Sequence, residues 1–159
     1  MRLINFNSNI TIYLAEPRWD SCALNMARKV LLVCNLRGHG ISLNLSNDKQ
    51  IKYFNNRWKG KNRPTNVLSF PNLKTSADPS FQKNYLGDII LSYQTLKKES
   101  KDGKLLFINH MAHLLTHGIL HLKGFTHENR SREKTMQKEE INILKRLNIS
   151  NPYINYRLI

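Results

Sequence analysis

Residues 108–127 read INHMAHLLTHGILHLKGFTH and overlap the strongest helical pattern of the chain. Apolar residues recur at helical spacing over 104–122, which predicts one long central helix. Gly124 follows this segment and predicts the end of the helix, because glycine readily adopts the left-handed backbone that closes helices.

The same stretch holds five of the six histidines of the chain. His117 and His121 are four residues apart, so their imidazoles lie on one face of the helix. Gly124 lets the chain turn back and bring His127 toward them. Three neutral imidazoles and one solvent molecule form an open tetrahedral site that suits zinc. The pattern therefore predicts one Zn²⁺ ion; the competing interpretation is a polar helix face with satisfied histidines.

The histidine spacing is that of the metzincin metalloprotease motif, with one difference. Those proteases carry a glutamate as general base directly after the first histidine. Here that position is Gly118, and no acid lies between Asp102 and Glu128. A protease is therefore disfavoured. Cleavage of RNA depends less on a protein side chain than peptide hydrolysis does. The 2′-hydroxyl of RNA is itself a nucleophile, and a metal can polarise the phosphoryl oxygen or supply hydroxide.

Two other side chains are candidates for supporting the site. His113 lies four residues before His117, where it either fixes the tautomer of a ligand histidine or is a core histidine. Asp88 either orients a metal-bound histidine, lies near the scissile phosphate, or acts as a turn residue. His110, one turn further away from His117 than His113, is predicted to be structural.

The segments around the central helix predict one α+β domain over residues 1–148, followed by a C-terminal tail, 149–159. Strands are expected at 3–14, 40–46, 65–70 and 86–92, forming a small four-stranded sheet. Further helices are expected at 23–34 (ended by Gly38), from 48 (capped by Asp48), at 93–100 and at 128–148. The polar stretch 72–85 predicts a functional or mobile loop.

Composition points to a polyanionic partner. The 159 residues contain 25 Lys and Arg against 11 acids, a formal charge of +14. Nucleic acid is the leading candidate and an anionic membrane surface the second. Because no signal core or run of about 18 apolar residues occurs, the chain is predicted to be soluble and cytoplasmic. Cys22 and Cys34 are predicted to be buried thiols without a disulfide.

The densest positive segment is NRWKGKNRP, residues 56–64. Four of its residues are bases that alternate: Arg57, Lys59, Lys61 and Arg63. Alternation places them on one side of an extended segment, where they can track phosphates while Trp58 stacks on a base. The competing interpretation is a solvated loop that Trp58 anchors to the core. In 128–148, by contrast, bases mix with glutamates that include Glu140, which predicts a solvated face.

Three runs together carry a family resemblance: PTNVLSFP (64–71), LGDI (86–89) and AHLLTHGILHLKGFTH (112–127). They resemble the YbeY family of bacterial rRNA maturation factors over about residues 41–147. The resemblance implies a zinc-binding endoribonuclease specific for single strands, with a mixed four-stranded sheet. It implies a role in maturing the 3′ end of small-subunit (16S) rRNA and in ribosome quality control. Implied partners are the small ribosomal subunit, the GTPase Era and a small-subunit ribosomal protein.

Carried over to this sequence, the resemblance makes His117, His121 and His127 the zinc ligands. The first two and Lys59 would be the catalytic residues. Lys59 stands where the family usually has arginine; lysine keeps the charge but lacks the bidentate fork that suits phosphate, and Arg57 or Arg63 would compensate. Thr126 stands where the family usually has aspartate, which removes a carboxylate beside the ligands.

The sequence thus predicts a metal-dependent endoribonuclease that acts on ribosomal precursor RNA. The main alternative is a ribosome-assembly factor that binds rRNA without cutting it and uses zinc structurally. A third is a metal-dependent hydrolase of another substrate, including a peptide, which Gly118 disfavours.

Overall fold

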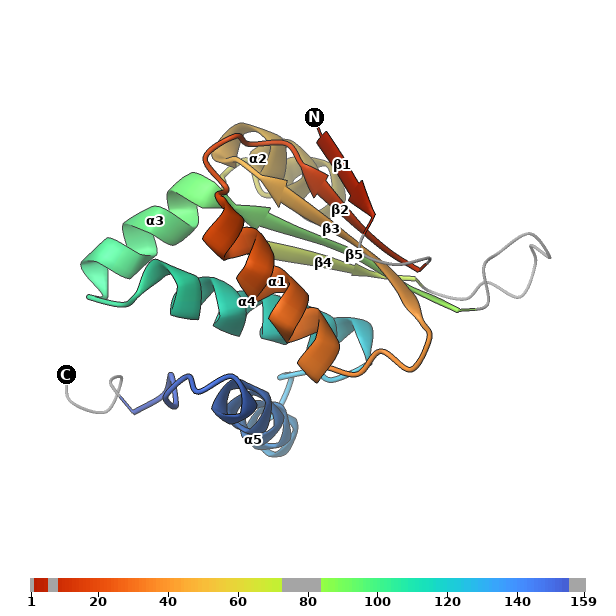
Figure 1. The fold of residues 1–159 in the computed structure, drawn as a ribbon, viewed down its shortest axis with the longest axis vertical. Helices are drawn as coiled ribbons and strands as arrows, with labels where there is room; N and C mark the ends of the chain where they lie inside the picture. The colour runs from red at the N-terminus through yellow and green to blue at the C-terminus, as the bar shows by residue number, and fades with distance from the viewer. Residues whose placement is uncertain (1, 6–8, 73–83, 155–159) are drawn as a thin grey trace.

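The computed structural model describes residues 2–5, 9–72 and 84–154 and confirms the α+β class (Figure 1). Its strands form one sheet in the order β1-β2-β3-β5-β4. The strands are β1 (Arg2–Asn5), β2 (Ile10–Leu14), β3 (Gly40–Ser46), β4 (Val67–Pro71) and β5 (Tyr85–Ser92). The three central strands are parallel, and β1 and β4 pair with them antiparallel at the two edges. The sheet is therefore mixed.

The sheet has five strands rather than the expected four, because the N-terminal segment forms two strands. Arg2 pairs with Leu14 and Asn5 with Thr11 in antiparallel register. The sequence that joins β1 to β2 is rich in asparagine, which favours turns and was the signal for the reversal. The loop expected at 72–85 falls mostly outside the described residues, since 73–83 are not described.

The expected helices are present: α1 (Ser21–Val33), α2 (Asp48–Lys59), α3 (Tyr93–Asp102), α4 (Phe107–Leu122) and α5 (Arg130–Arg146). Their ends differ from the predictions. The central helix α4 begins at Phe107 rather than at 104, because Lys104 has a left-handed backbone with φ of 51°. Helix α1 ends at Val33, ahead of Gly38. No helix among the described residues is long and apolar enough to cross a membrane.

The expected cap of α2 is also one residue away from its real position. Asn47 caps this helix, and its Oδ1 accepts a hydrogen bond from the Gln50 amide (3.0 Å). Asp48 instead accepts from the Thr95 amide (3.2 Å) and the Ser92 hydroxyl (2.5 Å), at the start of α3. Asp48 therefore caps the neighbouring helix and ties the N-termini of α2 and α3 together.

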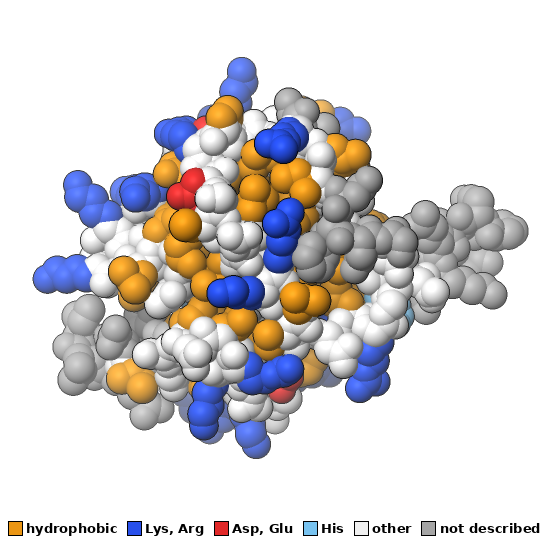
Figure 2. Space-filling model, viewed as in Figure 1, with side chains coloured by type: hydrophobic (Ala, Val, Ile, Leu, Met, Phe, Trp, Pro, Cys, Tyr) orange, Lys and Arg blue, Asp and Glu red, His pale blue; other side chains and the backbone are white. Residues whose placement is uncertain are grey.

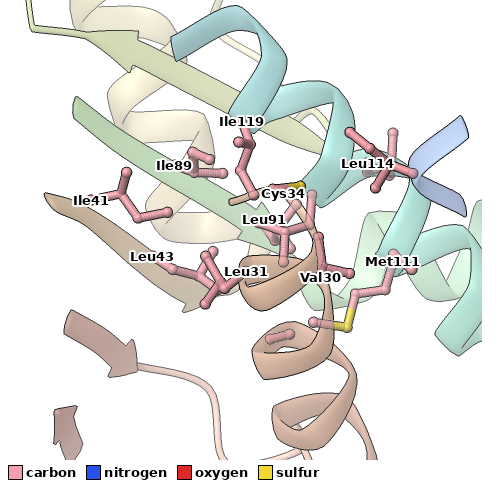
Figure 3. Close-up of a cluster of buried hydrophobic side chains, with 14 of the residues drawn as sticks. Val30, Leu31, Cys34, Ile41, Leu43, Ile89, Leu91, Met111, Leu114 and Ile119 are labelled. Atoms are coloured by element: carbon pink, nitrogen blue, oxygen red, sulfur yellow. The ribbon is translucent and has the colours of Figure 1, made fainter. Parts of the chain in front are cut away.

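Helices α1 and α4 cover one face of the sheet, and α2 lies on the other face (Figure 1). Helix α5 packs against α4 and α1. Between the sheet and its two covering helices lies the main core, with side chains from α1, β3, β5 and α4 pointing toward one another (Figure 3). It includes Val30, Leu31, Ile41, Leu43, Ile89, Leu91, Met111 and Ile119. The central place predicted for α4 is confirmed.

Gly118 allows α4 to approach the sheet closely. A Cβ atom at this position would lie 3.0 Å from the Ser69 hydroxyl and 3.2 Å from the Ile89 side chain. This side of α4 is therefore filled by β4 and β5, and a glutamate at position 118 would meet them. The structure thus gives a packing reason for the residue that separates this sequence from the protease motif.

The two cysteines differ in exposure. Cys34 is buried beside the end of α1, as predicted, whereas Cys22 is exposed in the first turn of the same helix. The prediction of two buried thiols is therefore wrong for Cys22. Its position on the solvent side of α1 follows from the stripe that α1 buries: Ala23, Ala27, Val30 and Leu31.

Candidate metal centre

The three histidines predicted as ligands come together at the C-terminal end of α4. His117 and His121 lie in its last two turns, and His127 follows in the segment after the helix. One nitrogen of each ring lies within 4.8 Å of the others. The Nε2 atoms of His117 and His121 are 3.0 Å apart. Among the described residues, no aspartate, glutamate or cysteine joins this cluster.

The turn after α4 brings His127 back, as the sequence predicted. Gly124 has φ of +91°, and its amide donates to the His121 carbonyl (3.0 Å). The Phe125 amide donates to the Leu120 carbonyl (3.0 Å). This pair of hydrogen bonds is the Schellman motif, which requires a left-handed residue at the position of Gly124. The motif ends the helix and sets the direction of the chain toward His127.

Hydrogen bonds at the Nδ1 atoms fix the tautomers of two ligand rings. His117 Nδ1 donates to Glu140 Oε1 (2.6 Å), and His121 Nδ1 donates to the Phe125 carbonyl (3.0 Å). A carboxylate and a carbonyl only accept, so both Nδ1 atoms carry the ring proton. Two unprotonated Nε2 atoms therefore face each other, and a cation between them removes the repulsion of their lone pairs. The donor set fits a metal ion.

Glu140 is the site residue that the sequence interpretation missed. Its side chain was predicted to lie on a solvated face of the last helix, but Glu140 is fully buried. Its Oε2 accepts from the Tyr153 hydroxyl and lies 3.5 Å from His113 Nε2. Burial acts to raise the pKa of Glu140, but hydrogen bonds from His113, His117 and Tyr153 lower it to about 2. The buried carboxylate is ionised because its donors compensate for lost water.

A signal for Glu140 was present in the sequence. Met136, Glu140, Ile143 and Leu144 are the residues that α5 buries. Their spacing of four and three places the acid within the apolar stripe rather than opposite it. An ionisable residue in a buried stripe requires a polar partner, which here is His117.

The other supporting candidates lie in different places. His113 contacts Tyr153 edge-on, with ring centroids 5.5 Å apart, and reaches the site through Glu140. Its supporting role remains a prediction. Asp88 lies on the sheet face opposite α4, because alternation along β5 turns Ile89 toward α4 and Asp88 away. Its carboxylate accepts from the Tyr85 hydroxyl (2.8 Å). The proposed contact of Asp88 with a ligand histidine is therefore wrong.

His110 has the structural role predicted for it. Its Nε2 is 2.7 Å from Glu99 Oε2, which joins α4 to α3. Asn66 also donates to this carboxylate (3.1 Å), so the start of β4 is held to the same pair of helices.

The basic segment was predicted to be extended, and this prediction is wrong because half of the segment is helical. Arg57 and Lys59 belong to α2, which ends where Gly60 takes a left-handed backbone (φ 65°). Residues two apart on a helix point in different directions, so alternation does not align these two charges. The guanidinium of Arg57 lies over the Trp58 ring, 5.8 Å from its centroid. Lys61 and Arg63 follow the helix, and all four bases are exposed.

Lys59 lies within electrostatic reach of the histidine cluster. The pKa of His121 is lowered, first by burial and then by the neighbouring His117, with His127 and the charge of Lys59 adding to the effect. Trp58, next to Lys59, is 64% exposed. Lys123, Thr126 and Arg132, from the turn after α4 and the start of α5, line a hollow of about 440 Å³.

Comparison with known proteins gives a consistent result. The family described as endoribonuclease YbeY matches residues 5–148. The endoribonuclease YbeY of Rhodopseudomonas palustris strain CGA009 is 40% identical over 116 residues, 73% of this chain and 61% of that protein. That of Magnetococcus marinus is 40% identical over 123 residues, 72% of this chain and 82% of that protein.

The match thus spans less than two thirds of the length of the Rhodopseudomonas protein. A solution structure of a Thermotoga maritima protein is similar in fold. It has a TM-score of 0.55 and 23% sequence identity, and the similarity covers 86% of this chain and 91% of that one.

Proposed function

The chain belongs to the YbeY endoribonuclease family, and we propose that it is a metal-dependent endoribonuclease that cleaves single-stranded precursor ribosomal RNA. One observation carries the proposal. The Nε2 atoms of His117 and His121 are 3.0 Å apart, while both Nδ1 atoms donate to acceptors on the far side of the rings. Family membership supports the reaction class, and this donor geometry supports the metal.

We propose that one Zn²⁺ ion is held by His117, His121 and His127. Three imidazoles leave a fourth position open, as in catalytic zinc sites. Zinc bound there would polarise a phosphoryl oxygen or lower the pKa of a bound water. The residues of the chain would supply the rest: Glu140 and the Phe125 carbonyl orient the ligand rings, and Lys59 attracts the scissile phosphate.

The substrate is proposed from charge and exposure. A chain with a formal charge of +14 attracts nucleic acid strongly. Trp58 offers an exposed indole next to Lys59, with its ring 6.3 Å from that of Phe70 on the edge strand β4, and stacking on it requires an unpaired base. Lys123 and Arg132 line the hollow at Gly124–Thr126, the segment before His127, although Arg132 is also paired with Glu128 (2.8 Å). These features favour a single strand that passes across the histidine cluster.

Family membership supports the finer assignment. We propose that the natural substrate is the 3′ end of small-subunit precursor rRNA, cut in the cytoplasm as part of ribosome maturation and quality control. The proposed partners are the small ribosomal subunit, the GTPase Era and a small-subunit ribosomal protein.

A second function is favoured by one observation. No carboxylate joins the histidine cluster among the described residues, and Glu140 faces the Nδ1 side of His117 rather than the Nε2 side. The nucleophile would then be metal-bound hydroxide or the 2′-hydroxyl of the RNA, with metal-bound hydroxide accepting the proton of the 2′-hydroxyl in the second case. If neither acts, the protein would be an rRNA-binding assembly factor in which zinc is structural.

The test compares three proteins on a 3′-extended small-subunit rRNA fragment. They are the natural sequence, His121→Ala and, as a matched control, His39→Ala, which removes a histidine outside the cluster. Product ends are mapped with and without chelator. We expect chelator-sensitive cleavage by the natural sequence and His39→Ala only. Equal cleavage by His121→Ala would contradict the metal site. RNA binding without cleavage by any of the three would support the assembly factor.

A further inference from the structure

We infer that Glu140 is a positioning residue for the metal ligand His117, and that Tyr153 holds Glu140 in place. The C-terminal segment after α5 is then part of the metal centre rather than an appended tail. This inference rests on the proposed metal centre but not on the identity of the RNA.

The two oxygens of Glu140 make separate contacts. Oε1 accepts from His117 Nδ1 (2.6 Å), whereas Oε2 accepts from the Tyr153 hydroxyl and lies 3.5 Å from His113 Nε2. Its partners come from α4 and from the C-terminal segment, while Glu140 itself belongs to α5. Three parts of the chain therefore fix one buried carboxylate, and its rotation would break contacts on both sides.

The Oε1 contact decides what His117 offers to a metal. A neutral imidazole exists as two tautomers, and an acceptor at Nδ1 selects the form that leaves Nε2 unprotonated. The carboxylate also makes the ring a stronger donor toward a cation. His121 receives the same help from a backbone carbonyl, Phe125, which no side-chain substitution removes directly. Glu140 is thus the place where the chemistry of the ligand set can be changed without touching a ligand.

Packing and hydrogen bonds anchor the C-terminal segment over Glu140. The chain turns at Asn148, whose φ is 57°, and Ile149 is buried in the main core cluster. The Ile149 amide donates to the Leu144 carbonyl (3.0 Å), and the Tyr153 amide donates to Asn151 Oδ1 (2.9 Å). The Tyr153 ring meets His113 edge-on. These contacts place the hydroxyl at the carboxylate.

A buried carboxylate with several donors can also serve stability alone, so the test needs a readout that stability does not move. The variants are Glu140→Gln, which keeps the shape and removes the charge, and Tyr153→Phe, which removes one oxygen. Matched controls are Glu133→Gln, on the exposed side of the same helix, and Tyr53→Phe, on α2. All are full-length proteins.

The first readout is zinc affinity, measured by competition with a chromophoric chelator. Loss of an outer partner of a ligand histidine typically lowers metal affinity by about 10- to 100-fold. We expect a loss in this range for Glu140→Gln, a smaller loss for Tyr153→Phe and none for the controls. Unchanged zinc affinity in folded Glu140→Gln and Tyr153→Phe would overturn the inference and leave the network a structural one.

The second readout is the tautomer of His117 in metal-free protein, observed by long-range ¹H–¹⁵N NMR. We expect the Nδ1–H form in the natural sequence and a mixture in Glu140→Gln. If the natural sequence binds no zinc, the proposed metal centre fails, yet this readout still decides whether Glu140 positions His117. If Glu140→Gln does not fold, Tyr153→Phe decides through both readouts, and an unchanged tautomer and affinity would overturn the inference.

Discussion

At the scale of single residues, the backbone of Gly124 supports two ligands at once. Its φ of +91° closes the helix, after which Phe125 supplies the carbonyl for His121 and His127 returns to the cluster. A side chain in this conformation costs about 1–2 kcal/mol. We predict that Gly124→Ala lowers the free energy of unfolding by about 1 kcal/mol and also weakens zinc binding, measured by denaturant unfolding and chelator competition.

Gly38 provides the matched control, because it also has a positive φ (+79°) and open space around it. Gly38→Ala should lose similar stability with no change in zinc affinity. Equal zinc affinities for the two variants would show that the turn at Gly124 does not set the ligand geometry.

The two thiols give a second prediction at this scale. Cys34 is 3% exposed, and burial raises its pKa to about 12. Because the thiolate is the reactive form, Cys34 is protected both by access and by charge state. In folded protein near neutral pH, a maleimide should modify Cys22 alone, and after denaturation it should modify both, as mass spectrometry of peptides will show. Labelling of Cys34 in the folded protein would contradict the burial of this side chain at the end of α1.

At the scale of elements, the pair Glu99 and His110 ties α3 to α4. Burial acts to raise the pKa of Glu99, but hydrogen bonds from His110 and Asn66 outweigh it, so the pKa is lowered from 4.5. A carboxyl whose pKa falls on folding stabilises the protein above its unfolded pKa and loses that effect as pH falls through the folded pKa. The stabilisation that the contact between Glu99 and His110 provides should therefore decrease in acid.

We predict that Glu99→Gln lowers the melting temperature near neutral pH, and that its difference from the natural sequence shrinks as pH falls below about 4.5. Thermal unfolding followed by circular dichroism across this range measures the difference. Glu128→Gln, which alters an exposed ion pair, is the control and should show little difference at any pH. If the difference in melting temperature between Glu99→Gln and the natural sequence is the same at every pH, the charge of Glu99 does not contribute to stability.

The comparison of sequence and structure is also clearest at this scale. Helix α4 was predictable because its core-facing positions repeat at helical spacing. The turn at Gly124 was predictable because a glycine directly after a helical pattern is typical of a helix end. The β1–β2 hairpin was missed because its two short strands read as one extended segment. The basic segment was misread because Gly60, which ends α2, lies among the charges themselves.

Glu140 escaped prediction for a different reason. Its contact with His117 joins residues 23 apart in sequence and depends on how α5 docks on α4. Periodicity within α5 marks Glu140 as buried but does not say which polar group it meets. The three ligands were accessible to sequence reasoning because they are local, whereas their supporting contacts depend on tertiary structure.

At the scale of the whole molecule, positive charge is widespread. Figure 2 shows Lys and Arg side chains distributed around the face that carries α1 and α3, with few acids between them. Such a surface attracts RNA without selecting a site. We expect selection to come from bases near the histidine cluster, and Lys59 is the candidate because its charge contributes, as the smallest cause, to the lowered pKa of His121.

This separation between general attraction and a local contact can be measured. Lys59→Gln and Lys101→Gln each remove one positive charge, but Lys101 lies in the last turn of α3, at the opposite end of α4 from His121 (Figure 1). Binding of an rRNA fragment is followed by fluorescence anisotropy at several salt concentrations, in a His121→Ala background so that cleavage does not interfere. Loss of one phosphate contact lowers the slope of log affinity against log salt by about 1.

We predict that Lys59→Gln weakens RNA binding and reduces this slope by about 1, while Lys101→Gln leaves the slope unchanged. Lys59→Arg should bind at least as tightly as the natural sequence, because a guanidinium contacts phosphate through two parallel hydrogen bonds. If Lys59→Gln and Lys101→Gln weaken binding equally, only the total charge matters. The RNA would then be held by the whole surface, and its position over the histidines would have to come from stacking on Trp58.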